Sequence, residues 1–157
     1  MVEFSKPTPG YLDDIAAHMR SEDRQEIGLS NPDMTAREVL EMSCHVFPDK
    51  AYVAIADGVP VCAFGVQRSN QLCPVGTIWL LGTGRMGRIA FARQSRKMLP
   101  KLFGTDIDVL TNFVWSKYGA AVRWLEWLGA RFLDSPVSSG REFVQFELLR
   151  SDIIVEA

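Results

Sequence analysis

The segment from Asp108 to Phe132, DVLTNFVWSKYGAAVRWLEWLGARF, constrains the fold more than any other part of the chain. It starts with an apolar run typical of a strand, passes through a short polar turn and continues as an amphipathic helix over residues 117–128. One face of that helix is apolar and carries Ala120, Ala121, Trp124, Leu125 and Leu128. Leu128-Gly129 then leads into another strand. This succession predicts an α/β (α+β) fold in which helices pack on a sheet.

The N-terminal part of the chain predicts a short strand followed by a helix. Val2 to Phe4 is the strand candidate, and Thr8 or Pro9 opens the helix. Apolar residues recur on one face of this helix at the spacing of helical turns. Gly28 and Asn31-Pro32 mark its end, so we expect one continuous helix in this region.

A capping box and a hairpin follow. Thr35 and Glu38 form a Thr-x-x-Glu capping box that starts a second helix, and Pro48 ends it. Asp57-Gly58 then separates two β-rich runs, which is a strong signal for a β-hairpin.

The remaining elements complete a mixed succession of strands and helices. A third strand, GTIWLL, spans residues 76–81, and its continuous apolar end predicts burial on both faces. A helix over residues 86–99 follows, with Pro100 near its end. Three further strands are expected over residues 108–114, 131–132 and 142–149. The expected order is β-α-α-β-β-β-α-β-α-β-β in one domain that covers residues 1–157.

Composition places the chain in the soluble globular class. Apolar residues make up 47% and charged residues 23% of its 157 residues, and the net charge is −2. That charge gives no global reason to bind nucleic acid. No apolar run approaches the roughly 20 residues of a membrane span. The N-terminus has no apolar signal-peptide core, so we expect a cytoplasmic protein.

The cysteines and histidines do not predict a disulfide framework or a metal site. Cys44, Cys62 and Cys73 form no CxxC pair and are interpreted as reduced thiols. His18 and His45 are the only two histidines, and no spacing resembles a zinc site.

The whole order of elements resembles the GNAT N-acetyltransferase superfamily. Within it, the runs IWLLGT, LTNFV and AAVRWLEWLGARF look most similar to the GNAT-like internal virion proteins of short-tailed bacteriophages. The resemblance covers nearly all of the chain. It implies a GNAT-like mixed sheet and an acyl-CoA cofactor, with acetyl-CoA as the expected one.

The resemblance also implies where the cofactor lies. In the superfamily, pantetheine lies between the third sheet strand and the strand after the long helix, and the pyrophosphate lies on backbone N–H groups at the start of that helix. A helix N-terminus suits an anion because its first N–H groups have no helical partner. The residues carried over as cofactor-binding candidates are Leu80, Leu81, Gly82, Thr83, Gly84, Arg85, Met86, Gly87, Arg88, Asn112 and Tyr118.

The glycine-rich loop carries its own evidence for and against a phosphate site. Its three glycines permit a tight turn and a close approach of the backbone to a ligand. The stretch after it is basic and contains no acid: Arg85, Arg88, Arg93, Arg96, Lys97 and Lys101. The alternative interpretation is a solvated helix face. The loop also departs from the superfamily pattern Gln/Arg-x-x-Gly-x-Gly/Ala in either frame, with Leu81 and Met86 or with Gly84 and Ile89 at the outer positions.

The same loop spells GxGxxG with Gly82, Gly84 and Gly87, which is the fingerprint of dinucleotide binding. Asp106 and Asp108 lie at a tolerable distance for a ribose contact. A Rossmann unit, however, opens a run of alternating strands and helices, whereas this loop follows three consecutive strands.

The usual catalytic tyrosine of the superfamily is absent. When the last helix is aligned on Ala121, Glu126 and Gly129, the tyrosine position is Leu125, which cannot donate a proton. Tyr118 near the helix start is the candidate for that role. Its alternative interpretation is a packing residue.

Other polar and aromatic residues are further candidates, each with an alternative interpretation. Acidic residues late in the first helix could line an acceptor cleft or form a solvated face: Glu22, Asp23 and Glu26. Cys44-His45 cannot form a dyad, since adjacent helical side chains point apart. Cys73 has no evident base nearby and is expected to be an inert thiol. Trp127 lies at the edge of an apolar helix face, where an exposed indole could contact a partner protein.

Two functions from different classes remain open. The first is an acyl-CoA-dependent N-acyltransferase that acts on a small or protein amine. The second is a non-catalytic phage protein that uses the GNAT fold as a scaffold and has virion proteins as partners. Nucleic-acid binding by the basic helix is less favoured, because no recognised motif or interleaved aromatic residue accompanies it.

Overall fold

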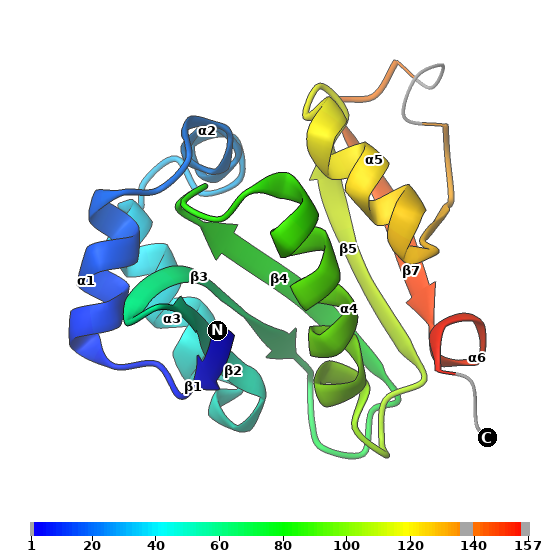
Figure 1. The fold of residues 1–157 in the computed structure, drawn as a ribbon. Coiled ribbons are helices and arrows are strands. Elements are labelled where there is room, and N and C mark those ends of the chain that lie inside the picture. Colours follow the sequence, from blue (N-terminus) through cyan, green and yellow to red (C-terminus); the bar gives the residue numbers. More distant parts are fainter. Residues whose placement is uncertain (1, 136–139, 155–157) are drawn as a thin grey trace. The chain divides into compact units, whose positions relative to one another are not determined.

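A computed structural model describes residues 2–135 and 140–154 (Figure 1). The elements follow in the order β1 (Val2–Ser5), α1 (Pro9–Ala17), α2 (Ser21–Ser30), α3 (Ala36–Val46), the 3₁₀ turn η1 (Pro48–Lys50), β2 (Ala51–Ala56), β3 (Val59–Gln67), β4 (Val75–Gly82), α4 (Arg88–Phe103), β5 (Val109–Trp115), α5 (Gly119–Leu128), β6 (Arg131–Phe132), β7 (Phe143–Leu149) and α6 (Arg150–Ile153).

The strands form a mixed sheet, as the sequence predicts. Among the described residues, seven strands are arranged in the order β1-β2-β3-β4-β5-β7-β6. The pairs β1–β2, β2–β3, β5–β7 and β6–β7 are antiparallel, whereas β4 and β5 run parallel. The α/β class with a mixed sheet is therefore confirmed.

The chain divides into two compact units. The first unit comprises Met1–Gln67 and Trp79–Gln94, and the second comprises Arg68–Ile78 and Ser95–Ala157. Strand β4 and helix α4 each contribute residues to both units. A single domain over residues 1–157 stays a prediction.

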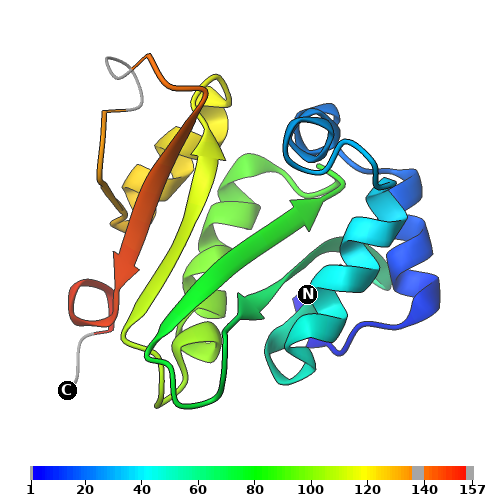
Figure 2. The same ribbon diagram turned by 180° about the vertical axis from the view of Figure 1, so that it is seen from behind.

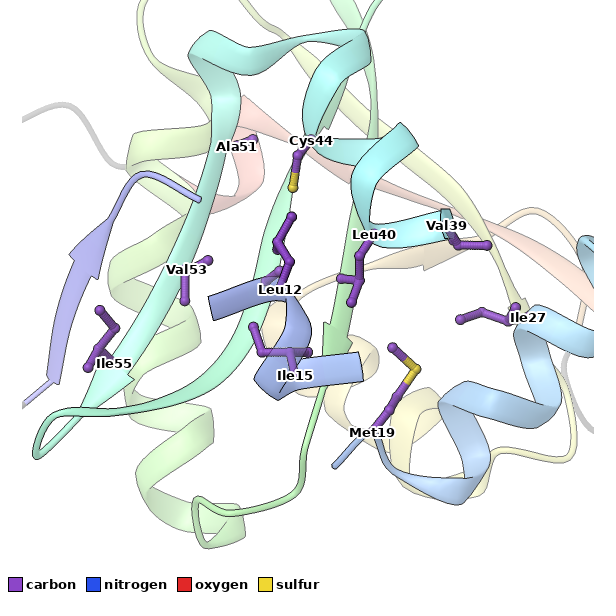
Figure 3. Packing of buried hydrophobic residues seen from close by; sticks show 11 residues of the cluster. Leu12, Ile15, Met19, Ile27, Val39, Leu40, Cys44, Ala51, Val53 and Ile55 are labelled. Carbon is purple, nitrogen blue, oxygen red and sulfur yellow. The ribbon is translucent and has the colours of Figure 1, made fainter. Parts of the chain in front are cut away.

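The core of the first unit lies between its N-terminal helices and strands β2 and β3. Helices α1 and α3 lie side by side (Figures 1 and 2). Leu12 and Ile15 of α1 meet Leu40 of α3 and Val53 of β2 in a buried cluster (Figure 3). The apolar spacing read from the sequence is what brings these side chains to one face.

Local signals set the ends of two helices as expected. The Thr8 side chain caps α1 by accepting a hydrogen bond from the Tyr11 N–H. The capping box of α3 is formed in both directions between Thr35 and Glu38. Asp57 and Gly58 both have positive φ in the turn between β2 and β3, which is the geometry of a tight hairpin.

The prediction of one continuous helix up to Asn31 is wrong. Helix α1 ends at Ala17, and a separate helix α2 begins at Ser21. Arg20 between them has extended backbone angles, φ −59° and ψ 145°. Its N–H donates to the carbonyl of Gly82 at 2.9 Å instead of to a helical carbonyl. A hydrogen bond to a residue far along the chain thus breaks the helix.

The second unit is built on the long pairing of β5 with β7. These strands pair from Val109↔Leu149 to Trp115↔Phe143 and lie side by side (Figure 2). Fully or nearly fully buried residues from its strands and helices form its core: Met98, Leu99, Leu102, Phe103, Leu110, Val122, Leu125, Leu128, Val144 and Leu148.

Helix α4 differs from the prediction at both ends. It begins at Arg88 and continues through Pro100 to Phe103. Proline removes one helical hydrogen bond, which is why the sequence predicted an end near Leu99. Leu102 and Phe103 are buried, so packing holds the last turn. Arg150 adds hydrogen bonds to the carbonyls of Phe103 and Gly104.

Strand β4 is less buried than its apolar sequence predicts. Its residues from Ile78 to Leu81 are half-buried, so the expected burial on both faces is wrong. Within the described part of the chain, no helix is long and apolar enough to cross a membrane.

Candidate functional site

The loop between β4 and α4 is held by a small set of hydrogen bonds in the first unit. The Thr83 N–H and hydroxyl both donate to the carbonyl of Val61, each at 2.9 Å. The Thr83 hydroxyl also accepts the N–H of Arg85 at 3.2 Å. Gly84 has φ +73°, a conformation that favours glycine. Gly84 therefore allows the tight turn of this loop, as the sequence predicts.

Backbone donors collect where this loop enters α4. Within the described part of the chain, the N–H groups of Gly84, Met86 and Gly87 have no hydrogen-bond partner. The first helical hydrogen bond of α4 runs from the N–H of Phe91 to the carbonyl of Gly87 at 2.9 Å. Free N–H groups at the start of a long helix, together with the helix dipole, suit an anion such as a phosphate.

Arg85 is engaged inside the first unit. Its guanidinium lies 2.6 Å from the carboxylate of Asp14 and donates to the carbonyl of Pro60 at 3.0 Å. The hydrogen bond from Arg85 is the main reason why the pKa of Asp14 lies below its ordinary value. Arg85 thus brings less free positive charge to the loop than the sequence suggests. The side chain of Arg88 lies outside the described residues.

A buried carboxylate contacts the start of the loop. Asp23 is 3% exposed, and its Oδ2 accepts hydrogen bonds from the Gly82 N–H at 2.8 Å and from Nη2 of Arg20 at 2.9 Å. Burial raises the pKa of Asp23, while the charge of Arg20 and the Gly82 N–H act in the opposite direction. The sequence predicts that Asp23 lines an acceptor cleft or lies on a solvated helix face, and its burial contradicts the solvated face. The contact with Gly82 has no signal in the sequence, because the two residues lie 59 positions apart.

Glu26 lies one turn further along α2. Burial raises the pKa of Glu26 to about 7, the negative charge of Asp23 raises it further, and Arg20 acts in the opposite direction. A carboxyl group with such a pKa can bind or release a proton near neutral pH.

A small pocket lies beside the loop in the first unit. It encloses about 340 Å³ of empty space, part of it open to solvent. Its lining is mainly apolar and consists of Arg20, Val61, Cys62, Gly82, Gly84, Met86 and Phe91. Three of the predicted cofactor-binding residues, Gly82, Gly84 and Met86, line this pocket. Leu80 and Leu81 are half-buried in β4.

Two predicted site residues lie in the second unit. The side-chain amide of Asn112 donates to the carbonyl of Ile78 at 2.5 Å and accepts the N–H of Phe113 at 2.7 Å. These bonds follow directly after Thr77↔Thr111, the last residue pair of the β4–β5 pairing. The side chain of Asn112 therefore provides a hydrogen bond to β4 at the end of the β4–β5 pairing.

Tyr118 is the residue that precedes α5. It is half-buried, and its N–H donates to the carbonyl of Trp115 at 2.9 Å. Leu125, at the position of the superfamily tyrosine, is 4% exposed inside the core of the second unit. The packing interpretation of Tyr118 and its catalytic interpretation both remain predictions.

Two of the three cysteines are buried. Burial raises the pKa of Cys44 to about 11 and that of Cys62 to about 12, so both are protonated at neutral pH. His45 lies 2.6 Å from Glu41 through Nε2. The thiol of Cys73 donates to the carbonyl of Val75 at 3.3 Å. Among the described residues, no group of His, Cys, Asp or Glu could hold a metal ion.

The tryptophans of α5 differ in environment. Trp124 is half-buried, and its indole N–H donates to the hydroxyl of Ser95 at 3.0 Å. Trp127 is 44% exposed, as the helix pattern predicts. The guanidinium of Arg96 lies over the Trp127 ring, 3.6 Å from its centroid. This contact covers part of the exposed indole with a cation.

Comparison with known proteins supports the fold. No protein-family model and no curated protein matches the sequence. Among solved structures, the chain is similar to spermidine N-acetyltransferase from Vibrio cholerae in complex with CoA and spermine, with 14% identity, 97% of each chain covered and a TM-score of 0.70.

Two further solved structures agree. A GNAT-family acetyltransferase from Bacillus anthracis has 10% identity and a TM-score of 0.66, with 96% of this chain and 95% of that chain covered. An N-acetyltransferase from Campylobacter jejuni in complex with acetyl coenzyme A has 8% identity and a TM-score of 0.59, with 96% and 99% covered. The chain has the fold of the GNAT N-acetyltransferases.

Proposed function

We propose that this protein is an acyltransferase that transfers an acetyl group from acetyl-CoA to an amine. The observation that carries the proposal is the loop at the start of α4. There, within the described residues, the N–H groups of Gly84, Met86 and Gly87 have no partner. Similar structures from Vibrio cholerae and Campylobacter jejuni hold CoA and acetyl coenzyme A. The fold and the free donors thus point to the same ligand.

In this loop, backbone N–H groups are better suited than side chains to bind the phosphate groups of acetyl-CoA. The free N–H groups are suitable donors to a pyrophosphate. Helix α4 adds positive charge without any acid, with exposed Arg93, Arg96, Lys97 and Lys101. Arg85 contributes less, because Asp14 holds its guanidinium. In this proposal Leu80 to Arg88 hold acetyl-CoA, and Asn112 and Tyr118 complete the site.

When bound, acetyl-CoA supplies an acyl group that is activated as a thioester. The chain must then accept a proton from the amine and provide one for the departing sulfur. Glu26 has a pKa suited to proton exchange near neutral pH. The Tyr118 hydroxyl is the candidate donor, since Leu125 has no ionisable group. The acidic residues of α2 would suit a cationic amine.

A second candidate function is a non-catalytic scaffold, and the buried Leu125 favours it. A side chain that is 4% exposed and apolar cannot take the role of the superfamily tyrosine. A fold can be kept while its chemistry is lost. The similarity to internal virion proteins of short-tailed phages, virion partners and the cytoplasmic location remain predictions, since none of the solved structures named above is a virion protein.

Amine-dependent release of the CoA thiol distinguishes the two functions. The protein is incubated with acetyl-CoA and a panel of small amines and lysine peptides, and free thiol is measured. We expect release with at least one amine class, and a drop of about a hundredfold in kcat for Tyr118→Phe, which is the lower end of the range for losing a general acid. Tyr52→Phe serves as the control, because it removes the same hydroxyl group from a tyrosine whose ring stacks on Phe64. Binding of acetyl-CoA without any amine-dependent release would favour the scaffold.

A further inference from the structure

Arg20 joins the break between α1 and α2 to the glycine loop. Its N–H donates to the carbonyl of Gly82 at 2.9 Å. Its side chain passes so close to Gly84 that a Cβ added there would lie 3.1 Å from Cγ of Arg20. The guanidinium continues toward Phe91 of α4, at 6.0 Å from the ring centroid. One residue therefore borders both the loop and the first turns of α4.

Asp23 completes this connection from the other side of the same glycine. Its Oδ2 accepts the Gly82 N–H at 2.8 Å and two bonds from Arg20, at 2.9 Å from Nη2 and 3.2 Å from Nε. The carbonyl of Gly82 is held by Arg20 and its N–H by Asp23. Both peptide groups of Gly82 are thus fixed by one short segment at the start of α2.

The charges of Arg20 and Asp23 affect how well the glycine loop can bind an anion. Asp23 is 3% exposed, and an unpaired carboxylate at that depth would be costly and would repel a nearby phosphate. The Arg20 side chain, 26% exposed, offsets this charge through its guanidinium and lines the pocket beside the loop. Removing one partner of such a buried, hydrogen-bonded ion pair strongly destabilises a protein, because the other charge stays buried without its partner.

We propose that Arg20 and Asp23 are positioning residues that hold Gly82, so that the N–H groups of Gly84, Met86 and Gly87 stand ready for a phosphate group of the cofactor. This inference rests on the proposed function for its ligand. The clamp itself, defined as Arg20, Asp23 and the backbone of Gly82, is a property of the ligand-free protein. Preorganised donors bind more tightly because less order must be imposed on binding.

The test combines backbone hydrogen exchange with ligand affinity in four variants of the full chain: Arg20→Gln, Asp23→Asn, the double variant and Arg37→Gln. Arg37 is the matched control, since it lies in the same unit and forms ion pairs with Asp13 and Glu41 away from the loop. Hydrogen exchange is measured without ligand over residues 79–90 and over β2 and β3. Affinity is measured for acetyl-CoA and for S-acetylpantetheine, which lacks the phosphates.

We expect much faster exchange in the loop of the Arg20 and Asp23 variants. The loss of protection in β2 and β3 should be smaller, since it reflects only the lower global stability of a protein with a broken ion pair. We expect acetyl-CoA affinity to fall about tenfold, equivalent to about 1.4 kcal/mol, with little change for S-acetylpantetheine. The double variant should lose little more than either single one, because the pair acts as a unit. Arg37→Gln should behave as the wild type.

Three results would overturn the inference. They are loop exchange equal to that of the wild type, acetyl-CoA affinity equal to that of the wild type, and an equal loss for both ligands, which would indicate general loosening of the site. Arg20→Lys, which keeps the charge, should recover part of the affinity. If the wild type itself bound no acetyl-CoA, the proposed function would be wrong, and the exchange comparison would still decide whether the clamp holds the loop.

Discussion

The guanidinium of Arg85 lies 2.6 Å from the carboxylate of Asp14 and thereby ties the glycine loop to α1. Arg85 also donates to the carbonyl of Pro60 at 3.0 Å. The most prominent cation of the loop is therefore partly neutralised by an internal partner. An anionic ligand at the loop has to compete with Asp14 for this charge.

Replacing Asp14 with Asn should strengthen acetyl-CoA binding. The change leaves the Arg85 charge without a compensating carboxylate beside the loop, which should raise affinity by about twofold to fivefold at low salt, the size of one exposed charge interaction. The gain should shrink at high salt because of screening. Titration calorimetry at two ionic strengths measures both effects. Asp13→Asn is the control, because Asp13 pairs with Arg37 instead. Equal affinities for the two variants would contradict the prediction.

Gly84 and Gly87 should respond differently to alanine. Gly84 has φ +73° and little space beside Arg20, so Gly84→Ala should destabilise the fold by about 1–2 kcal/mol and weaken acetyl-CoA binding. A Cβ at Gly87 would meet nothing within 4 Å, so Gly87→Ala should be close to neutral. Chemical denaturation gives the free energies of unfolding. A larger loss for Gly87→Ala than for Gly84→Ala would disprove this description of the loop.

The pKa of Glu26 predicts how stability depends on pH. The folded pKa of about 7 lies above the ordinary value of 4.5, so the folded state binds this proton more tightly than the unfolded chain. The resulting stabilisation is fully present below the unfolded pKa and is lost as the pH rises through the folded pKa.

Glu26→Gln should therefore flatten the loss of stability between about pH 5 and about pH 8, and should raise stability at the upper end by up to about 3 kcal/mol. Part of the slope should remain, because burial also raises the pKa of Asp23. Urea unfolding at several pH values measures the slope. An unchanged slope would mean that Glu26 is ionised in the folded protein at lower pH than expected.

Arg150 should matter for stability through the end of α4. Its guanidinium donates to the carbonyls of Phe103, Gly104 and Ile107 at 3.1, 2.7 and 2.9 Å. Arg150→Met should destabilise the fold by about 1–3 kcal/mol, because three partly buried carbonyl acceptors lose their donor. Arg131→Met is the matched control, since Arg131 is 63% exposed and pairs with Asp152 on the surface. Equal thermal shifts for the two variants would be incompatible with this role.

The sequence predicted those features of the fold that depend on residues close together in the chain. The capping box from Thr35 to Glu38 and the hairpin turn at Asp57-Gly58 were both confirmed, since each depends on residues that are neighbours in the chain. The break between α1 and α2 was missed, because the bond from Arg20 to Gly82 spans the sequence. The extension of α4 beyond Pro100 was missed for a related reason, since buried Phe103 and the distant Arg150 hold its last turn.

The candidate site was likewise predictable from the sequence only in part. Glycines and basic residues after β4 pointed to a phosphate loop, and Gly84 does adopt a glycine-favouring turn. Neither the engagement of Arg85 by Asp14 nor the grip of Asp23 on Gly82 could be predicted from spacing, because these contacts join separate elements of the first unit. The sequence therefore located the loop but not the side chains that control it.

Thermal unfolding with and without acetyl-CoA tests the central claim most directly. Ligand at about a hundredfold excess over its dissociation constant should stabilise the protein by about 2.7 kcal/mol. For a chain of this size that corresponds to a rise in Tm of roughly 5–10 °C. The rise should be smaller in Gly84→Ala and retained in Gly87→Ala. An unchanged Tm in the wild type at millimolar acetyl-CoA would contradict the cofactor site and favour the scaffold function.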